Sequence, residues 1–236
     1  MLRRKITDQL LAWKNTPGRK PLIIKGCRQC GKTFSVLEFS RKNYKHTVYL
    51  NFFENPDYAS VFSGSLEIDN IVMMLSALLG KDAVFEPGQT ILILDEIQDC
   101  PEARTALKFF RIDGRYDVIG TGSLLGVKGY GKEPRSVPVG SETVLEMYPL
   151  DFEEFLWATN DEMLADMISK STPQTPLPEP IHEQAVRQLR KFLVLGGMPA
   201  VIARFCKDGD LLECQRILKE LIQSYRDDFA TYRQRV

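Results

Sequence analysis

Short apolar runs recur along the first 150 residues, and turn or polar residues bound each of them. Runs that are apolar throughout, rather than alternating, are typical of strands buried on both faces of a parallel sheet. Apolar residues at helical spacing lie between the runs and predict helices over 32–41, 68–79 and 101–112. The predicted strands are Leu22–Ile24, Thr47–Leu50, Ile91–Leu94, Val118–Ile119 and Val144–Met147. This alternation predicts an open, doubly wound α/β sheet with helices on both faces.

The two ends of the chain carry helical patterns instead. Leu2, Ile6, Leu10 and Trp13 share one helical face and predict an opening amphipathic helix. From Asp151 onward only helical patterns occur, interrupted by the proline-rich stretch 171–180. We therefore expect two domains, residues 1–149 and 150–236. The second is expected to be a small all-helical segment, with a winged-helix arrangement as one alternative.

Composition narrows the class of protein. The 236 residues carry 31 Lys and Arg against 31 Asp and Glu, and this balance excludes a generally basic nucleic-acid coat. The 5 cysteines are an odd number and follow no secretory leader pattern, which indicates free thiols in a reducing compartment. The longest apolar stretch falls far short of the ~20 residues that span a bilayer. We expect a cytoplasmic protein with no membrane partner.

A phosphate-binding motif follows the first predicted strand. The segment Gly26–Thr33 matches the pattern G-x-x-x-x-G-K-[ST], with a predicted helix directly after it. The glycines let the loop turn its N–H groups inward toward phosphate oxygens, and the helix N-terminus adds a positive dipole end. Lys32 is expected to reach the β- and γ-phosphates and Thr33 to ligate Mg²⁺. The predicted nucleotide-binding residues are Gly26, Cys27, Arg28, Gln29, Cys30, Gly31, Lys32, Thr33 and Phe34.

An acidic pair ends the third predicted strand. Asp95 at the carboxyl end of a central strand can hold a magnesium ion together with Thr33. Glu96 beside it can orient and deprotonate an attacking water. A phosphate loop followed by an apolar strand ending in two acids is much more specific than either feature alone. Both features predict ATP and Mg²⁺ as the bound ligands.

Two further groups complete the candidate catalytic set of Lys32, Glu96, Thr121, Ser123 and Arg135. Thr121 or Ser123, in the glycine-rich segment after the fourth predicted strand, can place a hydroxyl near the γ-phosphate, and the sequence does not separate the two. Arg135, just before the fifth predicted strand, is a candidate finger toward a neighbouring copy's γ-phosphate. A solvated loop arginine is the alternative interpretation.

Several segments resemble the blocks of one known family. They are Trp13-Lys14, Ile24–Gly26, Arg28-Gln29, Gly31–Thr33, Asn51-Phe52, Leu94–Gln98, Leu107-Lys108, Thr121–Gly126, Pro138–Gly140, Tyr148–Leu150, Phe152–Leu156, Gly196–Pro199 and Tyr225–Asp228. Through them the chain resembles the AAA-type ATPases of bacteria and archaea whose P-loop domain precedes a C-terminal nuclease-like domain of unknown function. The resemblance implies a P-loop NTPase with a five-stranded parallel sheet of the additional-strand type. It also implies that the C-terminal domain is absent from this chain, which stops at Val236.

One position departs from the family pattern. Cys30 stands where a small apolar residue is expected, at a point where the side chain faces away from phosphate, so binding should survive. Cys27 and Cys30 form a C-x-x-C pair within the loop. We interpret them as small residues tolerated in a tight turn rather than as a redox switch.

The predicted function is Mg²⁺-dependent ATP hydrolysis coupled to a conformational change of a partner or of the missing domain. A small-molecule kinase needs no water-activating acid, and a GTPase would carry a guanine-reading Asn-Lys-x-Asp motif, which the sequence lacks. A slow nucleotide-gated switch with little turnover stays open as the alternative. The expected partners are ATP and ADP, a second copy in a homo-oligomer, and an unidentified protein or nucleic-acid client.

Overall fold

The computed structural model describes residues 2–123 and 140–234, with side chains described as far as residue 227. The chain divides into two compact units between Met147 and Tyr148. The unit Ile6–Met147 is called the core unit below. The remainder, residues 2–5 together with 148 onward, is called the helical unit. The sequence pattern does not predict that the first residues belong with the C-terminal part.

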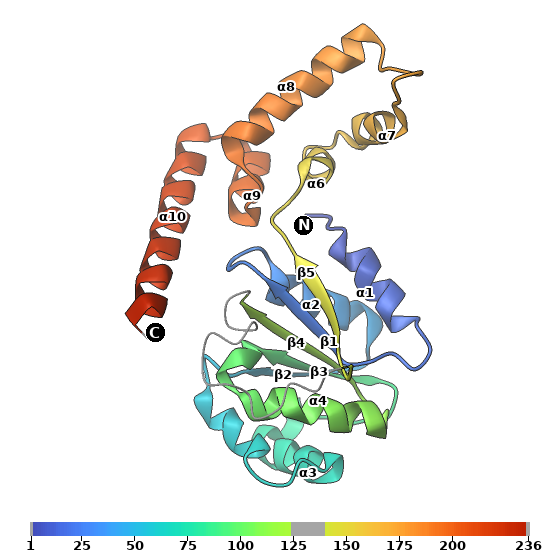
Figure 1. Ribbon diagram of the computed structural model, residues 1–236, viewed down its shortest axis with the longest axis vertical. Coiled ribbons are helices and arrows are strands. Elements are labelled where there is room, and N and C mark those ends of the chain that lie inside the picture. The colour runs from blue at the N-terminus through green and yellow to red at the C-terminus, as the bar shows by residue number, and fades with distance from the viewer. Residues whose placement is uncertain (1, 124–139, 235–236) are drawn as a thin grey trace. The chain divides into compact units, whose positions relative to one another are not determined.

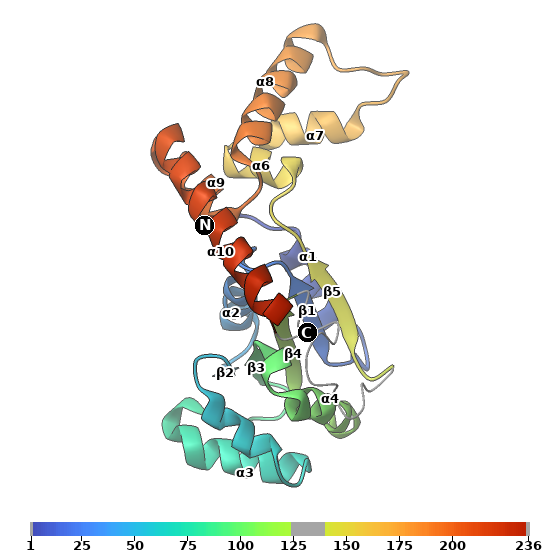
Figure 2. The same cartoon turned by 60° about the vertical axis from the view of Figure 1, so that its left-hand side comes forward.

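A five-stranded parallel sheet forms the centre of the core unit. Its strands are β1 (Leu22–Gly26), β2 (His46–Asn51), β3 (Thr90–Asp95), β4 (Asp117–Ser123) and β5 (Thr143–Met147). Their order across the sheet is β2-β3-β4-β1-β5, as Figure 2 shows. All five strands predicted from apolar runs are confirmed. Because β4 lies between β1 and β3, one additional strand separates the phosphate-loop strand from the acid-bearing strand.

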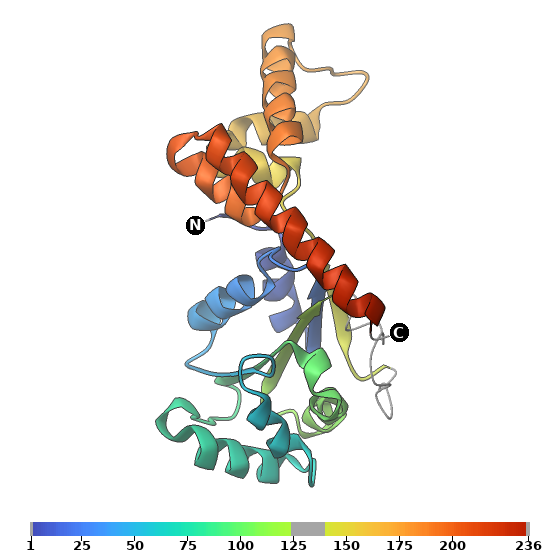
Figure 3. The ribbon, with the colours of Figure 1, turned by 90° about the vertical axis from the view of Figure 1, so that its left-hand side faces the viewer.

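Helices cover both faces of this sheet (Figures 1 and 3). They are α1 (Ile6–Lys14) and α2 (Lys32–Asn43) on one face, and α3 (Ile68–Leu79) and α4 (Pro101–Asp113) on the other. Three short 3₁₀ segments accompany them: η1 (Pro56–Phe62), η2 (Gly80–Asp82) and η3 (Ile97–Asp99). Alternate β3 residues point to opposite faces: Ile91 and Ile93 pack toward α1 and α2, Leu92 and Leu94 toward α3 and α4. Both faces of β3 are therefore buried, as its unbroken apolar run predicted.

Two local expectations in the core unit were wrong. The helix predicted to open at Leu2 begins at Ile6, and Leu2 packs in the apolar cluster of the helical unit. The glycine-rich segment expected to follow the fourth strand is part of it, because β4 extends through Ser123. The extension pairs with β1, whose residues Ile24 to Gly26 lie in register with Thr121 to Ser123, and Gly120 packs closely there: a Cβ on it would lie 2.6 Å from Ile23 Cδ1.

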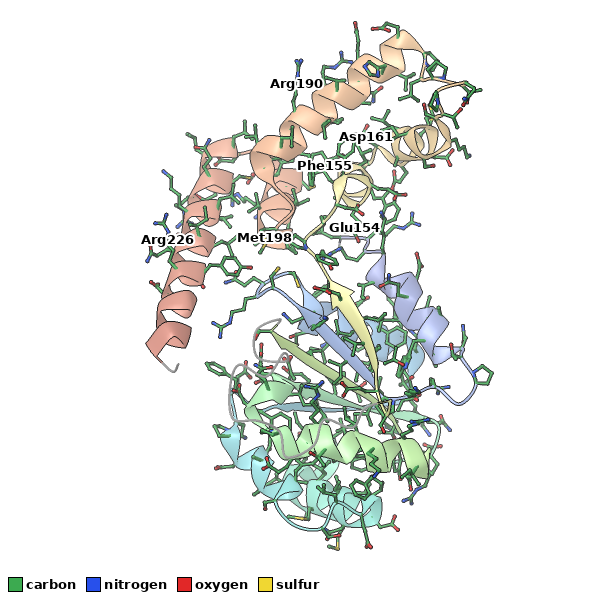
Figure 4. The ribbon with its side chains drawn as sticks, viewed as in Figure 1. Glu154, Phe155, Asp161, Arg190, Met198 and Arg226 are labelled. Carbon is green, nitrogen blue, oxygen red and sulfur yellow. The ribbon has the colours of Figure 1, made fainter. Side chains whose placement is uncertain are left out.

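The helical unit contains α6 (Phe152–Ala158), α7 (Glu162–Lys170), α8 (Glu179–Leu195), α9 (Pro199–Asp208) and α10 (Leu211–Gln234). Its core is aromatic, with the Phe155 ring 5.4 Å from Phe192 and 6.4 Å from Phe205, centroid to centroid (Figure 4 labels Phe155). Among residues 148–234 the only extended pairing is an isolated bridge between Thr172 and Thr175. The described part of this unit is therefore all-helical and holds no winged hairpin.

A turn of two glycines and a proline joins α8 to α9. Gly196 ends α8 at a φ of 68°, a left-handed conformation that glycine adopts without strain. A Cβ on Gly197 would lie 2.0 Å from the Leu150 carbonyl oxygen, so this contact requires glycine. Pro199 then begins α9, where a missing N–H costs nothing.

A buried ion pair joins the first residues to α6. The Arg4 guanidinium lies 3.1 Å from Glu154 Oε1 and donates a second hydrogen bond of 2.7 Å to the Tyr148 carbonyl. The Lys5 amide donates to the same Glu154 oxygen at 2.7 Å, and Glu154 also closes a capping box with Asp151 at the start of α6. Residues 2–4 are therefore held outside any helix by a partner about 150 residues away.

None of the helices within the described ranges combines the length and the apolar character that crossing a bilayer requires.

Candidate nucleotide site

The phosphate loop runs from the end of β1 into the first turn of α2, and sterics fix its glycines. Gly31 has a φ of 97°, which glycine adopts freely. Gly26 is required for another reason: a Cβ there would lie 2.2 Å from the Met147 carbonyl oxygen on the neighbouring β5. Gln29 also has a positive φ, 60°, which is uncommon for a residue with a side chain. The loop is therefore tightly curled against the sheet.

Lys32 lies inside this curl. Its side chain is buried, and its ammonium donates to the carbonyl oxygens of Gly26 at 3.1 Å and Cys27 at 2.8 Å. No acid is among these partners. The Lys32 ammonium is therefore paired with neutral carbonyls of its own loop, at the mouth of the phosphate cradle.

The remaining loop residues divide into buried and exposed side chains. Cys30 is fully buried in the apolar layer below the loop, with its Sγ 3.6 Å from the Met147 carbonyl oxygen. Cys27 is half-buried, and the two thiols form no disulfide. Arg28 and Gln29 are exposed, and Phe34 on α2 is 59% exposed.

Asp95 is the centre of the polar cluster at the carboxyl edge of the sheet. It ends β3 with only 3% exposure, and three hydroxyl groups donate to its carboxylate. Thr33 Oγ1 lies 3.1 Å from Oδ1 and 3.0 Å from Oδ2. The Tyr49 hydroxyl donates to Oδ2 at 2.7 Å, and Thr121 donates to Oδ1. The structure thus brings together the two predicted metal ligands, Thr33 and Asp95, and the predicted residue Thr121.

Tyr49 and Asn51 belong to this cluster, although no motif in the sequence marks either of them as a site residue. Tyr49 lies within an apolar run and counted only as a strand residue. Burial raises the pKa of Tyr49 well above its ordinary value, and the hydrogen bond to Asp95 raises it further, so the phenol stays a proton donor. Tyr49 lies two residues before the end of β2. Its place in the site can be recognised only once β2 is known to pair with β3.

Glu96, the predicted general base, has a left-handed backbone with a φ of 52°. Such a conformation costs energy in a non-glycine residue and is concentrated at functional sites. The side-chain amide of Gln98 donates to Glu96 Oε2 at 2.5 Å. The other amide atom, Gln98 Oε1, is buried and has no hydrogen-bond partner within residues 2–123 and 140–227. Gln98 is a third residue, after Tyr49 and Asn51, that the sequence did not mark as part of the site.

The remaining predicted residues are Ser123 and Arg135. Ser123 ends β4 on the same face as Thr121, is 7% exposed, and is paired in register with Gly26 of the phosphate loop. Arg135 lies outside the described residues.

The donor set suits magnesium rather than a metal held by protein alone. Within the described residues no group of three or more His, Cys, Asp or Glu side chains could bind a metal ion. Mg²⁺ is characteristically held by one or two carboxylates with substrate phosphates and water. One hydroxyl and one carboxylate beside a phosphate loop fit that chemistry.

The fold and the site together define a P-loop nucleotide-binding domain with one additional strand between β1 and β3. The chain belongs to the AAA domain family, whose model matches residues 18–156. The match begins before β1 and ends within α6. Membership of this family supports nucleotide binding and hydrolysis in general.

Similar folds occur among solved structures. PCH-2 of C. elegans has a TM-score of 0.49 at 11% identity, over 95% of this chain and 69% of that one. The Aeropyrum pernix ORC1 protein in complex with DNA has a TM-score of 0.44 at 14% identity, over 83% and 67%. Drosophila ORC bound to DNA has a TM-score of 0.45 at 14% identity, over 93% and 60%. A search of curated proteins found no match.

Proposed function

We propose that this protein binds ATP together with Mg²⁺ and hydrolyses the terminal phosphate bond. The observation that carries the proposal is the meeting of Thr33 with Asp95 at the carboxyl edge of the sheet. These residues are 62 positions apart in the chain, and their side-chain oxygens lie 3.0 Å from each other. Lys32, Glu96 and Thr121 come from the same edge.

The phosphate loop supplies the binding step in this proposal. The main chain of Gly26, Cys27, Arg28, Gln29, Cys30 and Gly31 offers N–H groups, and the Lys32 ammonium exchanges its loop carbonyls for phosphate oxygens. The exposed ring of Phe34 directly follows Thr33 and offers an apolar surface to the nucleotide. Thr33 and Asp95 would hold Mg²⁺, which supplies positive charge to the phosphates when bound.

Glu96 supplies the proton chemistry. Its carboxylate would orient a water and accept a proton as the water oxygen bonds to the γ-phosphorus and the bond to ADP breaks, giving ADP and phosphate. Gln98 fixes one carboxylate oxygen, which supports an oriented base. Because Thr121 donates to Asp95, we assign contact with the γ-phosphate to Ser123.

Coupling of this cycle to a partner is the further part of the proposal. We expect the nucleotide state to change the conformation of a bound partner or of a further domain, with the client, protein or nucleic acid, left open. In a homo-oligomer Arg135 would reach the nucleotide of a neighbouring copy.

Two contacts favour a second candidate function, a nucleotide-gated switch with little turnover. The Lys32 ammonium is paired with the loop's own carbonyl oxygens, and the Glu96 carboxylate is paired with Gln98. The Lys32 ammonium must therefore give up these hydrogen bonds before it binds phosphate, and Gln98 already occupies one of the two Glu96 carboxylate oxygens. A protein whose partner triggers this rearrangement would bind ATP and hydrolyse it slowly.

Nucleotide affinity tests the binding step that both functions share. In Lys32→Ala we expect binding of a fluorescent ATP analogue to weaken by about 100-fold, because two charge-assisted hydrogen bonds to phosphate are lost. Lys42→Ala is the matched control, since Lys42 is an exposed lysine of the same helix that pairs with Glu38. Equal affinities of the two variants would contradict the assignment of the loop.

A further inference from the structure

The Asp95 carboxylate is held by one hydroxyl from each of the two strands that flank β3. The sheet order places β2 on one side of β3 and β4 on the other. Tyr49 of β2 donates to Oδ2 at 2.7 Å, and Thr121 of β4 donates to Oδ1. Each carboxylate oxygen therefore has a donor on its own neighbouring strand.

The third hydroxyl, that of Thr33, differs from these two. It lies in the first turn of α2, directly after the phosphate loop, and not on the sheet. Its oxygen is 3.1 Å from one carboxylate oxygen and 3.0 Å from the other. Since a hydroxyl has one proton, it cannot make two full hydrogen bonds, and Thr33 is the most weakly committed of the three donors.

The Tyr49 hydroxyl is itself held by a hydrogen bond from Asn51. Asn51 Nδ2 donates to the Tyr49 hydroxyl oxygen at 3.2 Å, which directs the phenol proton toward Asp95. Asn51 Oδ1 accepts the amides of Phe53 and Glu54, both at 3.0 Å. Asn51 is 8% exposed and pairs with Asp95 in the strand register. The phenol is therefore part of an ordered chain of hydrogen bonds that ends at the carboxylate.

We propose that Tyr49 is a positioning residue of the magnesium site: it fixes Asp95 Oδ2 from β2 while Thr121 fixes Oδ1 from β4. The carboxylate is then oriented before magnesium and nucleotide arrive, and Thr33 is the donor that changes partner. This inference rests on the proposed function. Groups that orient a metal-binding carboxylate typically change metal affinity by 10–100-fold when removed.

The test measures magnesium dependence through binding, not through turnover. A fluorescent ADP analogue is titrated in EDTA and at increasing Mg²⁺, and the half-effective Mg²⁺ concentration is read from the tightening of binding. In Tyr49→Phe this concentration should rise at least about tenfold. Affinity in EDTA should stay within twofold of the wild type, because the phosphate loop is untouched.

Tyr44→Phe is the matched control. The Tyr44 hydroxyl also donates to a carboxylate oxygen at 2.7 Å, that of Asp117, at the opposite end of the strands. It should leave the half-effective Mg²⁺ concentration unchanged. Thr121→Val removes the hydroxyl donor on β4 and should also raise the half-effective Mg²⁺ concentration. Because both donors act on one carboxylate, the effects should not be independent. In the Tyr49→Phe Thr121→Val double variant, the fold-change in half-effective Mg²⁺ concentration should differ from the product of the two single fold-changes.

The outcomes separate this inference from the proposed function. Wild-type protein that binds no nucleotide, or binds it without regard to Mg²⁺, overturns both. A magnesium-dependent wild type with an unaltered Tyr49→Phe overturns the inference alone. So does a Tyr49→Phe that loses binding in EDTA as well, since Tyr49 would then support the fold rather than the metal site.

Discussion

The core unit and the helical unit both bury polar side chains, but they use them differently. In the core unit Lys32, Asn51, Asp95, Thr121 and Ser123 lie buried at one edge of the sheet. In the helical unit, as far as residue 227, the buried ionic groups are Arg4 and Glu154, which pair with each other (Figure 4 labels Glu154).

The difference lies in how the buried charges are satisfied. Arg4 and Glu154 carry opposite charges and have additional main-chain partners, so each charge is satisfied without a ligand. Within residues 2–123 and 140–227, the Lys32 ammonium is hydrogen-bonded to neutral carbonyls, and the Asp95 carboxylate is hydrogen-bonded to hydroxyls and the Glu96 amide. A buried charge without a counter-charge is costly unless a ligand supplies one. The buried polar groups of the core unit therefore suit a ligand-binding site, whereas those of the helical unit hold its own segments together.

The largest effect is expected when the Arg4–Glu154 ion pair of the helical unit is broken. Arg4→Ala leaves the buried Glu154 carboxylate without its counter-charge, and we expect the helical unit to lose about 3–5 kcal/mol of stability. Hydrogen exchange should increase in α6 and stay unchanged in β3. Equal loss of protection in β3 would contradict a pair that serves the helical unit.

The next largest effects come from two matched glycine substitutions, one in each unit. Gly26→Ala places a Cβ 2.2 Å from the Met147 carbonyl oxygen, and Gly197→Ala places one 2.0 Å from that of Leu150. Each should destabilise its own unit by about 2–3 kcal/mol, because backbone rather than a flexible side chain must move. Nucleotide binding should weaken in Gly26→Ala and persist in Gly197→Ala. Binding lost equally in both variants would remove the distinction between the units.

The smallest expected effect concerns pH. Burial raises the pKa of Asp151, but hydrogen bonds from Lys5 and from the start of α6 outweigh it, so the pKa lies below its ordinary value of 3.8. A lowered folded-state pKa adds stability above the unfolded value, and this stability is lost as pH falls through the folded one. Asp151→Asn should cost about 1 kcal/mol or less at pH 7, since solvent screens this half-exposed group. The difference from wild type should shrink below pH 3.8, which denaturant unfolding at pH 7 and pH 3 measures.

Local signals in the sequence predicted most of the core unit. Each strand is a compact apolar run, and the phosphate loop is a contiguous motif whose glycines have steric reasons now visible at Gly26 and Gly31. The meeting of Thr33 with Asp95 was also predicted, because Asp95 ends one parallel strand and Thr33 follows the phosphate loop that begins at the end of another.

What the sequence missed depends on contacts between distant segments. Tyr49 gains its role only from the neighbouring position of β2 and β3. The opening helix was extended wrongly to Leu2, because the pattern does not show that Glu154 holds Arg4 and Lys5. The glycines of β4 indicated a turn, whereas the segment pairs with β1 as a strand and Gly120 packs closely against Ile23.

The measurement that tests the central claim most directly is phosphate release from ATP and Mg²⁺, with wild type beside Glu96→Gln and Glu102→Gln. Glu102 is an exposed glutamate in the first turn of α4 and serves as the control. Turnover in Glu96→Gln should fall by about 100-fold or more with ATP affinity retained, and Glu102→Gln should match the wild type. Unchanged turnover in Glu96→Gln, or a wild type that binds ATP without releasing phosphate, would contradict hydrolysis at this site.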